Sequence, residues 1–332
     1  MLRFIKDWTL PLAMCTGAVF YFVFAFVPAL DGAAQFFSPI MTAILPLFMF
    51  LILFVTFCKV DFRKLLPVAW HFWVGVFQLL FIGIVMVIIL QLSTVKGSTG
   101  LPLLSGGAAE AIILLEAILM CIISPCATAA AVVTQKLGGS LEQMTTYTFL
   151  SNFITVILAP ICFPLIEPSV HMDFWPAFLK ILHEVFIVLI VPMLLAYVVK
   201  HTMKTLHRRI VGVKDLSYYL WACSLMIVTG TTVKNIVHAQ AGLWLLIAIG
   251  MLGLVVCVVQ FAVGRYIGHF FGHAQEAGQA LGQKNTAFAI WLSSTYLNPL
   301  SSVGPGCYIL WQNIINSFEI WQKRKEEKLY SP

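Results

Sequence analysis

Long apolar segments dominate the pattern of hydrophobic and polar positions along this chain. Most of them run for about twenty residues or more, the length that a helix needs to cross roughly 30 Å of hydrocarbon at about 1.5 Å per residue. Ten segments are predicted to be transmembrane helices: 8–28, 38–57, 66–92, 108–136, 142–166, 174–200, 215–233, 241–265, 274–296 and 300–321. The pattern therefore predicts an all-α, multi-pass membrane protein.

The composition agrees with a chain that lies in a lipid bilayer. Hydrophobic residues make up 60% of the 332 residues and charged residues only 10%, whereas an ordinary soluble domain carries about 25% charged residues. The mean hydropathy is +0.94. The eight cysteines are scattered without a C-x-x-C pair, which indicates buried apolar side chains rather than a disulfide or metal framework.

The distribution of Lys and Arg predicts the orientation, because short cytoplasmic loops retain basic residues. With ten spans, one side collects Arg3, Lys6, Lys59, Arg63, Lys64, Lys136, Lys200, Lys204, Arg208, Arg209, Lys214, Arg265, Lys323, Arg324, Lys325 and Lys328. The other side collects Lys96 and Lys234, with Lys180 near its edge. Both termini are therefore expected in the cytoplasm, with the bacterial inner membrane as the expected location. The net charge of +6 follows from this asymmetry and does not indicate nucleic-acid binding.

Two of the predicted helices, 108–136 and 274–296, are interrupted by residues that do not suit a helix in lipid. The first carries Pro125 within "IISPCATAAAVV", and a proline removes a backbone hydrogen bond and clashes with the preceding turn. The second carries Lys284 beside an asparagine and a threonine within "GQKNTAFAIW". We expect both helices to be discontinuous.

The two interruptions occupy matching positions along the chain. Each lies in the fourth helix of a half of five helices, and each contains Thr-Ala-x-Ala followed by a β-branched residue, at 128–132 and 286–290. Interrupted segments at matching positions of two halves are typical of inverted-repeat transporters. The sequence thus predicts two inverted five-helix repeats, 1–168 and 169–332.

At these residues the chain resembles the bile acid:sodium symporter family, ten-helix secondary transporters of organic anions. Thr128 matches the threonine of a Pro-Gly-Gly-Thr-Ala-Ser-Asn-like segment, and Asn285 and Thr286 match the end of a Gln-Asn-Ser motif. "CYILWQN" at 307–313 is similar to a Trp-His-Asn sequence in the tenth helix. The resemblance, which covers most of the chain, implies a panel domain and a core domain, two unwound helices that cross at the membrane midplane, and sodium ions behind the crossing.

The chain departs from the family pattern at the positions that hold sodium. Ala130 and Ala131 stand where the family has Ser-Asn, Ala280 stands where the family has the glutamate that bridges both sodium ions, and Lys284 stands where the family has a glutamine. A hard cation needs several oxygen ligands, and an alanine side chain offers none. We therefore expect a divergent member with its sodium ligands largely replaced, no cofactor and no other metal; a remaining role for sodium is left open.

Lys284 is expected to take the place of one bound sodium ion. An ammonium group is a single positive charge with three donors, which can satisfy the carbonyl and amide oxygens that surrounded the cation. The resemblance implies a glutamine near this site on the third predicted helix, which corresponds to Gln78, and Gln78 is expected to accept a hydrogen bond from Lys284. Gln283 belongs to the same predicted ion-coupling set. A lysine at the centre of a membrane helix costs about 2.5–3.5 kcal/mol on insertion scales, a cost that usually marks function. The alternatives are a structural anchor or a location at the membrane surface.

A polar stripe on the fifth predicted helix adds two further candidates for ion coupling. Thr145, Thr148, Asn152 and Thr155 recur at helical spacing. Thr148 and Asn152 are the candidates, since the resemblance implies a serine and a threonine near sodium on this helix. The alternative is that these side chains bond to carbonyls of the preceding turn.

The predicted substrate is a small carboxylate or another organic anion. Interrupting the two helices creates helix N-termini near Thr128 and near Asn285, and free N–H groups at such ends favour anions. Thr286 is expected beside them. The resemblance adds Gln312 and Asn313, which correspond to a His-Asn pair that lines the family's substrate cavity.

The predicted function is secondary transport by alternating access, without catalytic residues, because motifs of zinc peptidases and serine hydrolases are missing. If Lys284 releases its proton, proton binding replaces sodium binding; if it stays charged, transport is exchange or facilitated diffusion. Three alternatives remain: a sodium-coupled symporter with one sodium site, a cation:proton antiporter, and a membrane sensor that binds a ligand without transport. The sequence indicates no particular oligomeric state.

Overall fold

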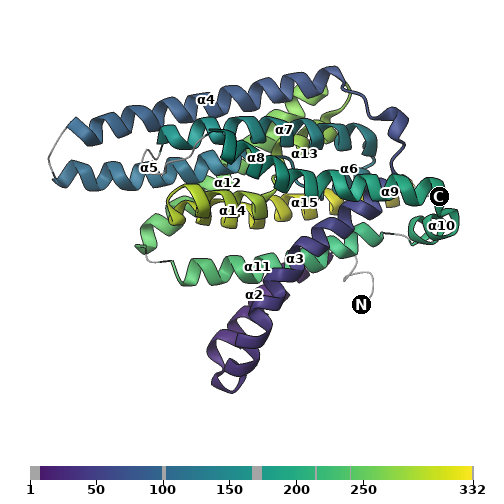
Figure 1. Cartoon of the computed structure of the whole chain (residues 1–332), viewed down its shortest axis with the longest axis horizontal. Helices are drawn as coiled ribbons and strands as arrows, with labels where there is room; N and C mark the ends of the chain where they lie inside the picture. Colours follow the sequence, from purple (N-terminus) through teal and green to yellow (C-terminus); the bar gives the residue numbers. More distant parts are fainter. Residues whose placement is uncertain (1–7, 99–101, 167–173, 214, 240, 331–332) are drawn as a thin grey trace.

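The computed structural model describes residues 8–98, 102–166, 174–213, 215–239 and 241–330, and nearly all of this backbone is helical (Figure 1). The first half contains α2 Thr9–Phe26, η1 Pro28–Leu30, α3 Asp31–Lys59, η2 Phe62–Lys64, α4 Ala69–Ser98, α5 Pro102–Ile123, α6 Ala130–Lys136 and α7 Leu141–Ile166. The second half contains α8 Phe174–Val185, η3 Phe186–Ile190, α9 Val191–Thr202, α10 Lys204–Gly212, α11 Leu216–Val237, α12 Leu243–His269, α13 Ala274–Gly282, α14 Thr286–Tyr296, η4 Pro299–Ser302 and α15 Val303–Tyr330.

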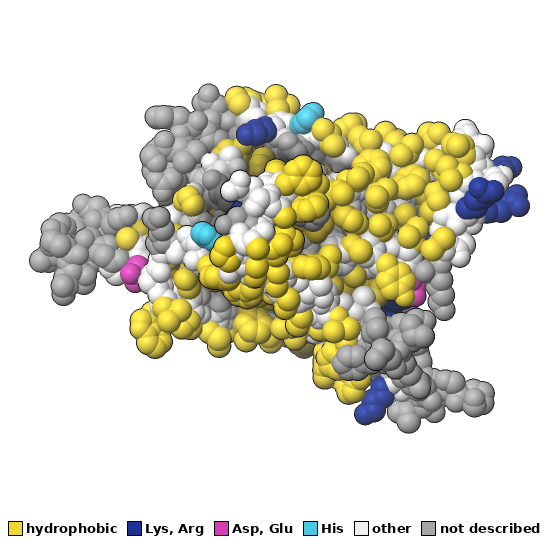
Figure 2. Space-filling model, turned by 90° about the horizontal axis from the view of Figure 1, so that it is seen from below, with side chains coloured by type: hydrophobic (Ala, Val, Ile, Leu, Met, Phe, Trp, Pro, Cys, Tyr) yellow, Lys and Arg dark blue, Asp and Glu magenta, His cyan; other side chains and the backbone are white. Residues whose placement is uncertain are grey.

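Several of these helices have the length and apolarity of membrane spans. Five meet both conditions: Thr9–Phe26, Ala69–Thr94, Leu141–Ile166, Leu216–Val237 and Leu243–His269. Large hydrophobic side chains such as Phe26 and Trp244 are exposed on the outside, and Figure 2 shows hydrophobic side chains over most of the visible face. A soluble monomer rarely exposes a continuous apolar surface of this kind. The chain is therefore an integral membrane protein, while the number of ten spans and the inverted repeat stay predictions.

The helices form two packed groups. In the oblique group, α2 packs against α11, and α3 packs against α11 and α9; α2 and α3 run obliquely across Figure 1. In the crossing group, α12 packs against α13, α15 and α5, and α4 packs against α5 and α7. Gly17 lies where α2 touches the backbone of α11 at Met226, and any side chain there would overlap the Met226 carbonyl.

The predicted helix 174–200 is not regular throughout. It consists of α8, a π-turn at Phe186–Ile190 and α9. Pro192 lies in the first turn of α9, and a proline has no N–H for the carbonyl of the preceding turn. The wider π-turn lies directly before this proline, as is common where an α-helical ladder is disturbed.

Both of the helices that the sequence predicts to be discontinuous are interrupted in the structure. α5 ends at Ile123 and α6 begins at Ala130, while α13 ends at Gly282 and α14 begins at Thr286. The two short pieces, α6 and α13, have 7 and 9 residues, which corresponds to about 10–14 Å of helix. The second interruption therefore lies near the middle of its helix pair, since α13 has 9 and α14 has 11 residues. The first lies closer to the end that carries Lys136, since α5 has 22 and α6 has 7 residues.

Candidate functional site

The two interruptions meet through their backbones. The N–H of Ala127 donates to the carbonyl of Gln283 at 2.9 Å, and the N–H of Asn285 donates to the carbonyl of Pro125, also at 2.9 Å. These bonds form an isolated antiparallel bridge between Cys126 and Lys284. An interrupted helix leaves N–H and C=O groups without intrahelical partners. Here each interruption gives one N–H donor and one carbonyl acceptor to the other. The two bonds therefore hold the two interrupted helices in a fixed register.

Side chains from neighbouring helices bond to several of the other backbone groups. Thr155 of α7 donates to the carbonyl of Ile123 at 2.7 Å, and the hydroxyl of Ser151 accepts from the N–H of Cys126 at 2.5 Å. At the second interruption, Tyr308 of α15 donates to the carbonyl of Gly282, the last residue of α13, at 2.7 Å. These bonds fix the ends of α5 and α13 from outside the two interrupted helices.

Lys284 lies inside this crossing and is only 1% exposed. Its ammonium Nζ donates to the carbonyl of Ile122 at 3.1 Å. The side chain of Gln312 holds the backbone of the same residue: Oε1 accepts from the Lys284 N–H at 2.8 Å, and Nε2 donates to the Lys284 carbonyl at 3.2 Å. The alternative of a lysine at the membrane surface is therefore wrong.

Gln78 lies next to Lys284, but its predicted hydrogen-bond partner is wrong. Its Nε2 donates to the carbonyl of Ile122 at 3.0 Å, the same oxygen that accepts from Lys284. Its Oε1 accepts from the hydroxyl of Tyr147 at 3.2 Å. A carbonyl oxygen at the C-terminus of a helix has two lone pairs and no intrahelical donor, so it can serve both residues.

Some buried polar atoms at the crossing lack a partner among the described residues. Gln283 is 1% exposed, and neither its amide oxygen nor its amide nitrogen is bonded. Asn313 donates to the carbonyl of Ile309 at 2.7 Å, but its Oδ1 has no partner. An unsatisfied buried polar group costs about 1–3 kcal/mol. Such groups beside a buried ammonium are suited to binding a polar ligand.

The remaining predicted substrate residues occupy the ends of the half-helices. Asn285 caps α14, because its Oδ1 accepts from the N–H of Phe288 at 3.2 Å. Thr286 begins α14 and is 4% exposed. Thr128 lies partly buried in the turn before α6. Their roles in substrate binding stay predictions, as do those of Gln312 and Asn313.

The two candidates on α7 bond within their own helix. The hydroxyl of Thr148 donates to the carbonyl of Met144 at 3.0 Å, and Nδ2 of Asn152 donates to the carbonyl of Thr148 at 2.8 Å. This is the alternative expected for a polar stripe whose side chains satisfy the preceding turn. A role of these two residues in ion coupling stays a prediction.

Residues 46–239 match the model of the sodium bile acid symporter family. The matched segment is more than half of the 332-residue chain. The chain belongs to the sodium bile acid symporter family. Its members are membrane transporters rather than enzymes, so the family supports a transported organic substrate. No curated protein matches the chain.

The family match includes the first interruption but ends before the second one. It runs from the second half of α3 to the end of α11 and so contains α5 and α6. Lys284 and its neighbours at the start of α14 lie beyond residue 239. The family match therefore does not include Lys284. Lys284 is connected to the matched segment through its hydrogen bond to the carbonyl of Ile122 at the end of α5.

Four of the residues that hold the crossing together were not predicted from the sequence, one of which is Tyr147, the donor to Gln78. Besides Ser151 and Tyr308, these include Gln260 of α12, whose Nε2 donates to the hydroxyl of Tyr308 at 2.9 Å and to the carbonyl of Cys121 at 3.2 Å. Gln260 is a single polar residue in the apolar run "CVVQFAVG". An isolated amide in an apolar membrane helix is the signal that could have pointed to Gln260.

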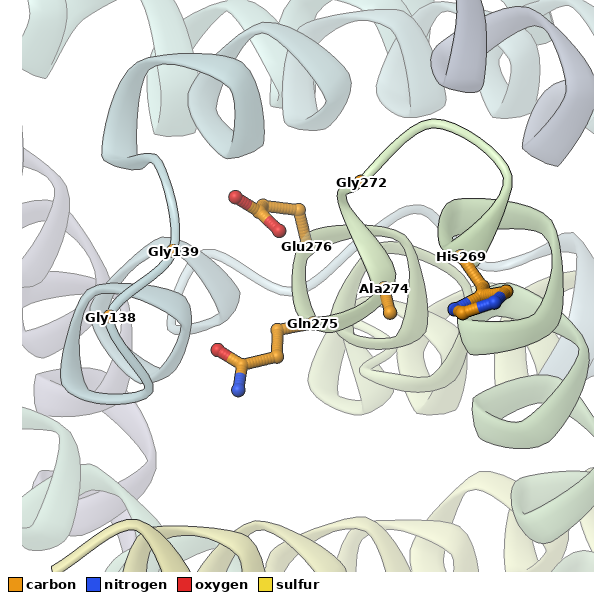
Figure 3. Close-up of a pocket in the computed structure, with 7 residues that line it drawn as sticks. All are labelled: Gly138, Gly139, His269, Gly272, Ala274, Gln275 and Glu276. Carbon is orange, nitrogen blue, oxygen red and sulfur yellow. The ribbon is translucent and has the colours of Figure 1, made fainter. Parts of the chain in front are cut away.

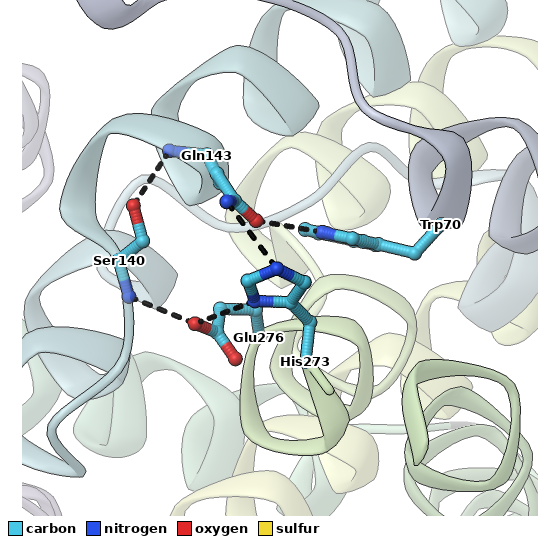
Figure 4. Close-up of polar contacts among 5 residues, drawn as sticks. All are labelled: Trp70, Ser140, Gln143, His273 and Glu276. Atoms are coloured by element: carbon cyan, nitrogen blue, oxygen red, sulfur yellow. Dashed lines mark hydrogen bonds and ion pairs between the residues drawn. The ribbon is translucent and has the colours of Figure 1, made fainter. Parts of the chain in front are cut away.

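A second polar cluster joins the outer ends of α6 and α13 (Figure 4). Oε1 of Glu276 accepts from the N–H of Ser140 at 2.9 Å and lies 3.3 Å from Nδ1 of His273. The His273 ring also lies 3.5 Å from Nε2 of Gln143, and Oε1 of Gln143 accepts from Trp70 at 2.8 Å. The short pieces of both interrupted helices are thus linked at the crossing and again at this end.

A cavity of about 350 Å³ opens beside this cluster (Figure 3). Its lining residues are Gly138, Gly139, His269, Gly272, Ala274, Gln275 and Glu276. Gly138 has a φ of 87°, which favours glycine. A Cβ atom at Gly139 would lie 2.7 Å from Cγ2 of Thr134 and 3.0 Å from Cδ of Glu276, so a larger residue would need these side chains to shift. The Gly-Gly sequence before α7 therefore lets the loop approach Glu276.

We expect Glu276→Ala to lower the free energy of unfolding by about 1–3 kcal/mol, because it leaves the N–H of Ser140 without its acceptor. The midpoint of thermal unfolding in detergent should fall by a few degrees. Gln275→Ala is the matched control, since Gln275 is exposed on the same turn. Equal midpoints for the two variants would contradict the structural role of this carboxylate.

Proposed function

We propose that this chain is a secondary transporter that moves a small organic anion by alternating access and does not use sodium. The observation that carries the proposal is the burial of the Lys284 ammonium at the crossing of the two interrupted helices, where it donates to the carbonyl of Ile122. A buried positive charge in a membrane protein usually marks a substrate or ion pathway.

The electrostatics of the crossing favour an anion. The side chains that bond there, which are Gln78, Tyr147, Ser151, Thr155, Gln260, Tyr308 and Gln312, are all neutral. Lys284 is the charged member of this set, and the N-terminus of α14 adds a partial positive charge next to it. A carboxylate can accept from the Lys284 donors that are not bonded to Ile122 and from the amide of Gln283.

The same residues do not fit a sodium ion. Lys284 already bonds to the Ile122 carbonyl that a cation would use, and two positive charges about 4 Å apart repel by roughly 4 kcal/mol at an effective dielectric constant of 20. Ala130, Ala131 and Ala280 are buried and offer no side-chain oxygen. No step of the proposed cycle passes through sodium.

The protonation of Lys284 decides how transport is driven. If the ammonium loses its proton once per cycle, an inward proton gradient drives uptake. If it keeps its proton, the anion follows its own gradient or exchanges for a second anion. A pH gradient imposed across proteoliposomes at constant external pH separates these two cases, because only the first gives uptake against the anion gradient.

Alternating access would come from rocking the crossing group against the oblique group. One contact between the groups joins α6, which packs against α7 and α13 of the crossing group, to α11 of the oblique group. Lys136 of α6 forms an ion pair with Asp215, directly before α11, and lies 5.2 Å from the ring centre of Tyr218. In the predicted orientation, this contact faces the cytoplasm.

We expect Asp215→Asn to loosen the contact at the Lys136 end by up to about 1 kcal/mol, because the ion pair is partly exposed. Hydrogen exchange in α6 and at the start of α11 should become up to about fivefold faster. Lys180→Gln, which weakens a contact between α8 and α14, should leave these segments unchanged. Unchanged exchange in the Asp215 variant would argue against a contact that opens during the cycle.

The experiment that tests the proposed function is uptake of radiolabelled carboxylates into proteoliposomes. The proposal predicts saturable uptake of at least one small organic anion above that of liposomes without protein. Each carboxylate is also tested for its effect on the thermal unfolding of the purified chain. A carboxylate that stabilises the chain but is never taken up would identify a ligand sensor and overturn the proposal.

A further inference from the structure

The short helix α10, Lys204–Gly212, lies across the direction of the long helices. It follows α9 after a break at Met203. In Figure 1, α10 is seen nearly along its axis, whereas α9 runs across the picture. None of its residues is buried. A helix that lies across the spans has the orientation of a helix in the plane of the membrane surface.

The sequence "KTLHRRIVG" gives α10 two different faces. At 100° per residue, Lys204, Arg208 and Arg209 lie on one side, while Leu206 and Val211 lie on the other. Leu206 is 39% exposed and Val211 is 38% exposed. A basic face opposite an apolar face is the pattern of an interfacial amphipathic helix.

Contacts with α3 place α10 at the level where the spans end. Nε2 of His207 lies 2.8 Å from the carbonyl of Cys58 near the end of α3, and Lys200 at the end of α9 donates to the carbonyl of Val60 at 2.8 Å. Ile210 packs against the apolar cluster that includes Phe57 and Val60. The position of α10 is therefore fixed, and its exposed apolar and basic side chains face the surroundings of the protein.

Further basic residues lie at the same end of the molecule. Arg63 and Lys64 in η2 are exposed, and α3, which precedes η2, ends next to α10. Figure 2 shows Lys and Arg side chains gathered at the end where α10 lies in Figure 1. Each basic side chain near an anionic membrane surface strengthens binding by about fivefold.

We propose that α10 binds the anionic headgroups of the surrounding bilayer. Leu206 and Val211 enter the boundary between headgroups and acyl chains, and Lys204, Arg208 and Arg209 bind the phosphates of anionic lipids. The occupant is a phosphate-bearing lipid with net negative charge, such as phosphatidylglycerol. This inference rests on α10 and α3 alone and does not depend on the transport proposal.

The test is native mass spectrometry of the full chain with equal amounts of phosphatidylglycerol and phosphatidylcholine. We expect the wild-type chain to retain at least about five times more phosphatidylglycerol than phosphatidylcholine. The triple variant Lys204→Gln, Arg208→Gln and Arg209→Gln should reduce this preference by at least about fivefold. The control variant, Lys323→Gln, Arg324→Gln and Lys325→Gln, also removes three positive charges, but from α15. It should keep most of the preference for phosphatidylglycerol over phosphatidylcholine.

A second variant tests the apolar face separately. Leu206→Ala with Val211→Ala keeps all basic residues, so it should release both lipids more readily while the ratio between them stays closer to wild type. If the α10 and α15 charge variants lose the preference for phosphatidylglycerol equally, the lipid is attracted only by the net positive charge of the protein, and the proposal is overturned. An unchanged preference in the α10 charge variant would overturn it as well.

Discussion

Replacing Lys284 by glutamine or by methionine is expected to reduce anion uptake by at least about 100-fold. Glutamine keeps hydrogen-bonding capacity but has no charge. Methionine keeps most of the length of the lysine side chain but has neither charge nor a hydrogen-bond donor. The charge of a buried ammonium beside a bound carboxylate is worth several kcal/mol at an effective dielectric constant of 20, and each 1.4 kcal/mol corresponds to a tenfold change. Initial uptake rates in proteoliposomes with equal amounts of protein measure this effect.

The matched control for this result is Lys180→Gln. Lys180 is also a lysine of a predicted membrane helix, but it contacts the rings of Trp291 and Tyr296 rather than the crossing. We expect its replacement to change uptake by less than about threefold, since an exposed cation–π contact contributes about 0.5–1 kcal/mol. Uptake by either Lys284 variant at a rate close to wild type would show that the ammonium has no part in transport.

The same Lys284→Met variant is expected to unfold at a temperature several degrees higher than the wild-type chain. A buried charge with one hydrogen bond is costly, and replacing buried charged groups by apolar ones of similar volume often stabilises a protein by about 1–4 kcal/mol. The Ile122 carbonyl is not left alone, because Gln78 still donates to it. Thermal unfolding in detergent measures the difference, and a gain in stability with a loss of uptake is the expected result for a functional charge.

Gln312→Leu is the comparison for this stability measurement. It removes both hydrogen bonds between the Gln312 amide and the backbone of Lys284 and leaves the buried N–H of Lys284 without its acceptor, so we expect it to lower the unfolding temperature. If Lys284→Met also lowers this temperature, Lys284 is a structural anchor of the crossing, as in the alternative considered for this residue.

The features that follow from backbone chemistry could be predicted from the sequence. Pro125 cannot take part in an uninterrupted helix, and the polar run at Lys284 does not suit a helix surrounded by lipid. Both segments are indeed interrupted, at 124–129 and 283–285. The approach of the two interruptions was implied by the family resemblance rather than by backbone chemistry, and the bridge between Cys126 and Lys284 joins them.

The choice of hydrogen-bond partners could not be predicted in the same way. The family resemblance places Gln78 near Lys284, but whether its amide accepts from the ammonium or donates to a neighbouring carbonyl depends on where α5 ends in space. Because the last carbonyls of α5 point into the crossing, donors from α4, α7 and α12 converge on them. Spacing along one chain does not reveal which of several helices supplies a donor to a given carbonyl.

The most direct test of the central claim compares uptake with and without sodium. Proteoliposomes are prepared with choline in place of sodium on both sides, and initial uptake of the transported anion is compared with that in an inward sodium gradient at equal ionic strength. A lysine that replaces the bound cation predicts rates that agree within about twofold. Uptake that occurs only with the sodium gradient would contradict the account.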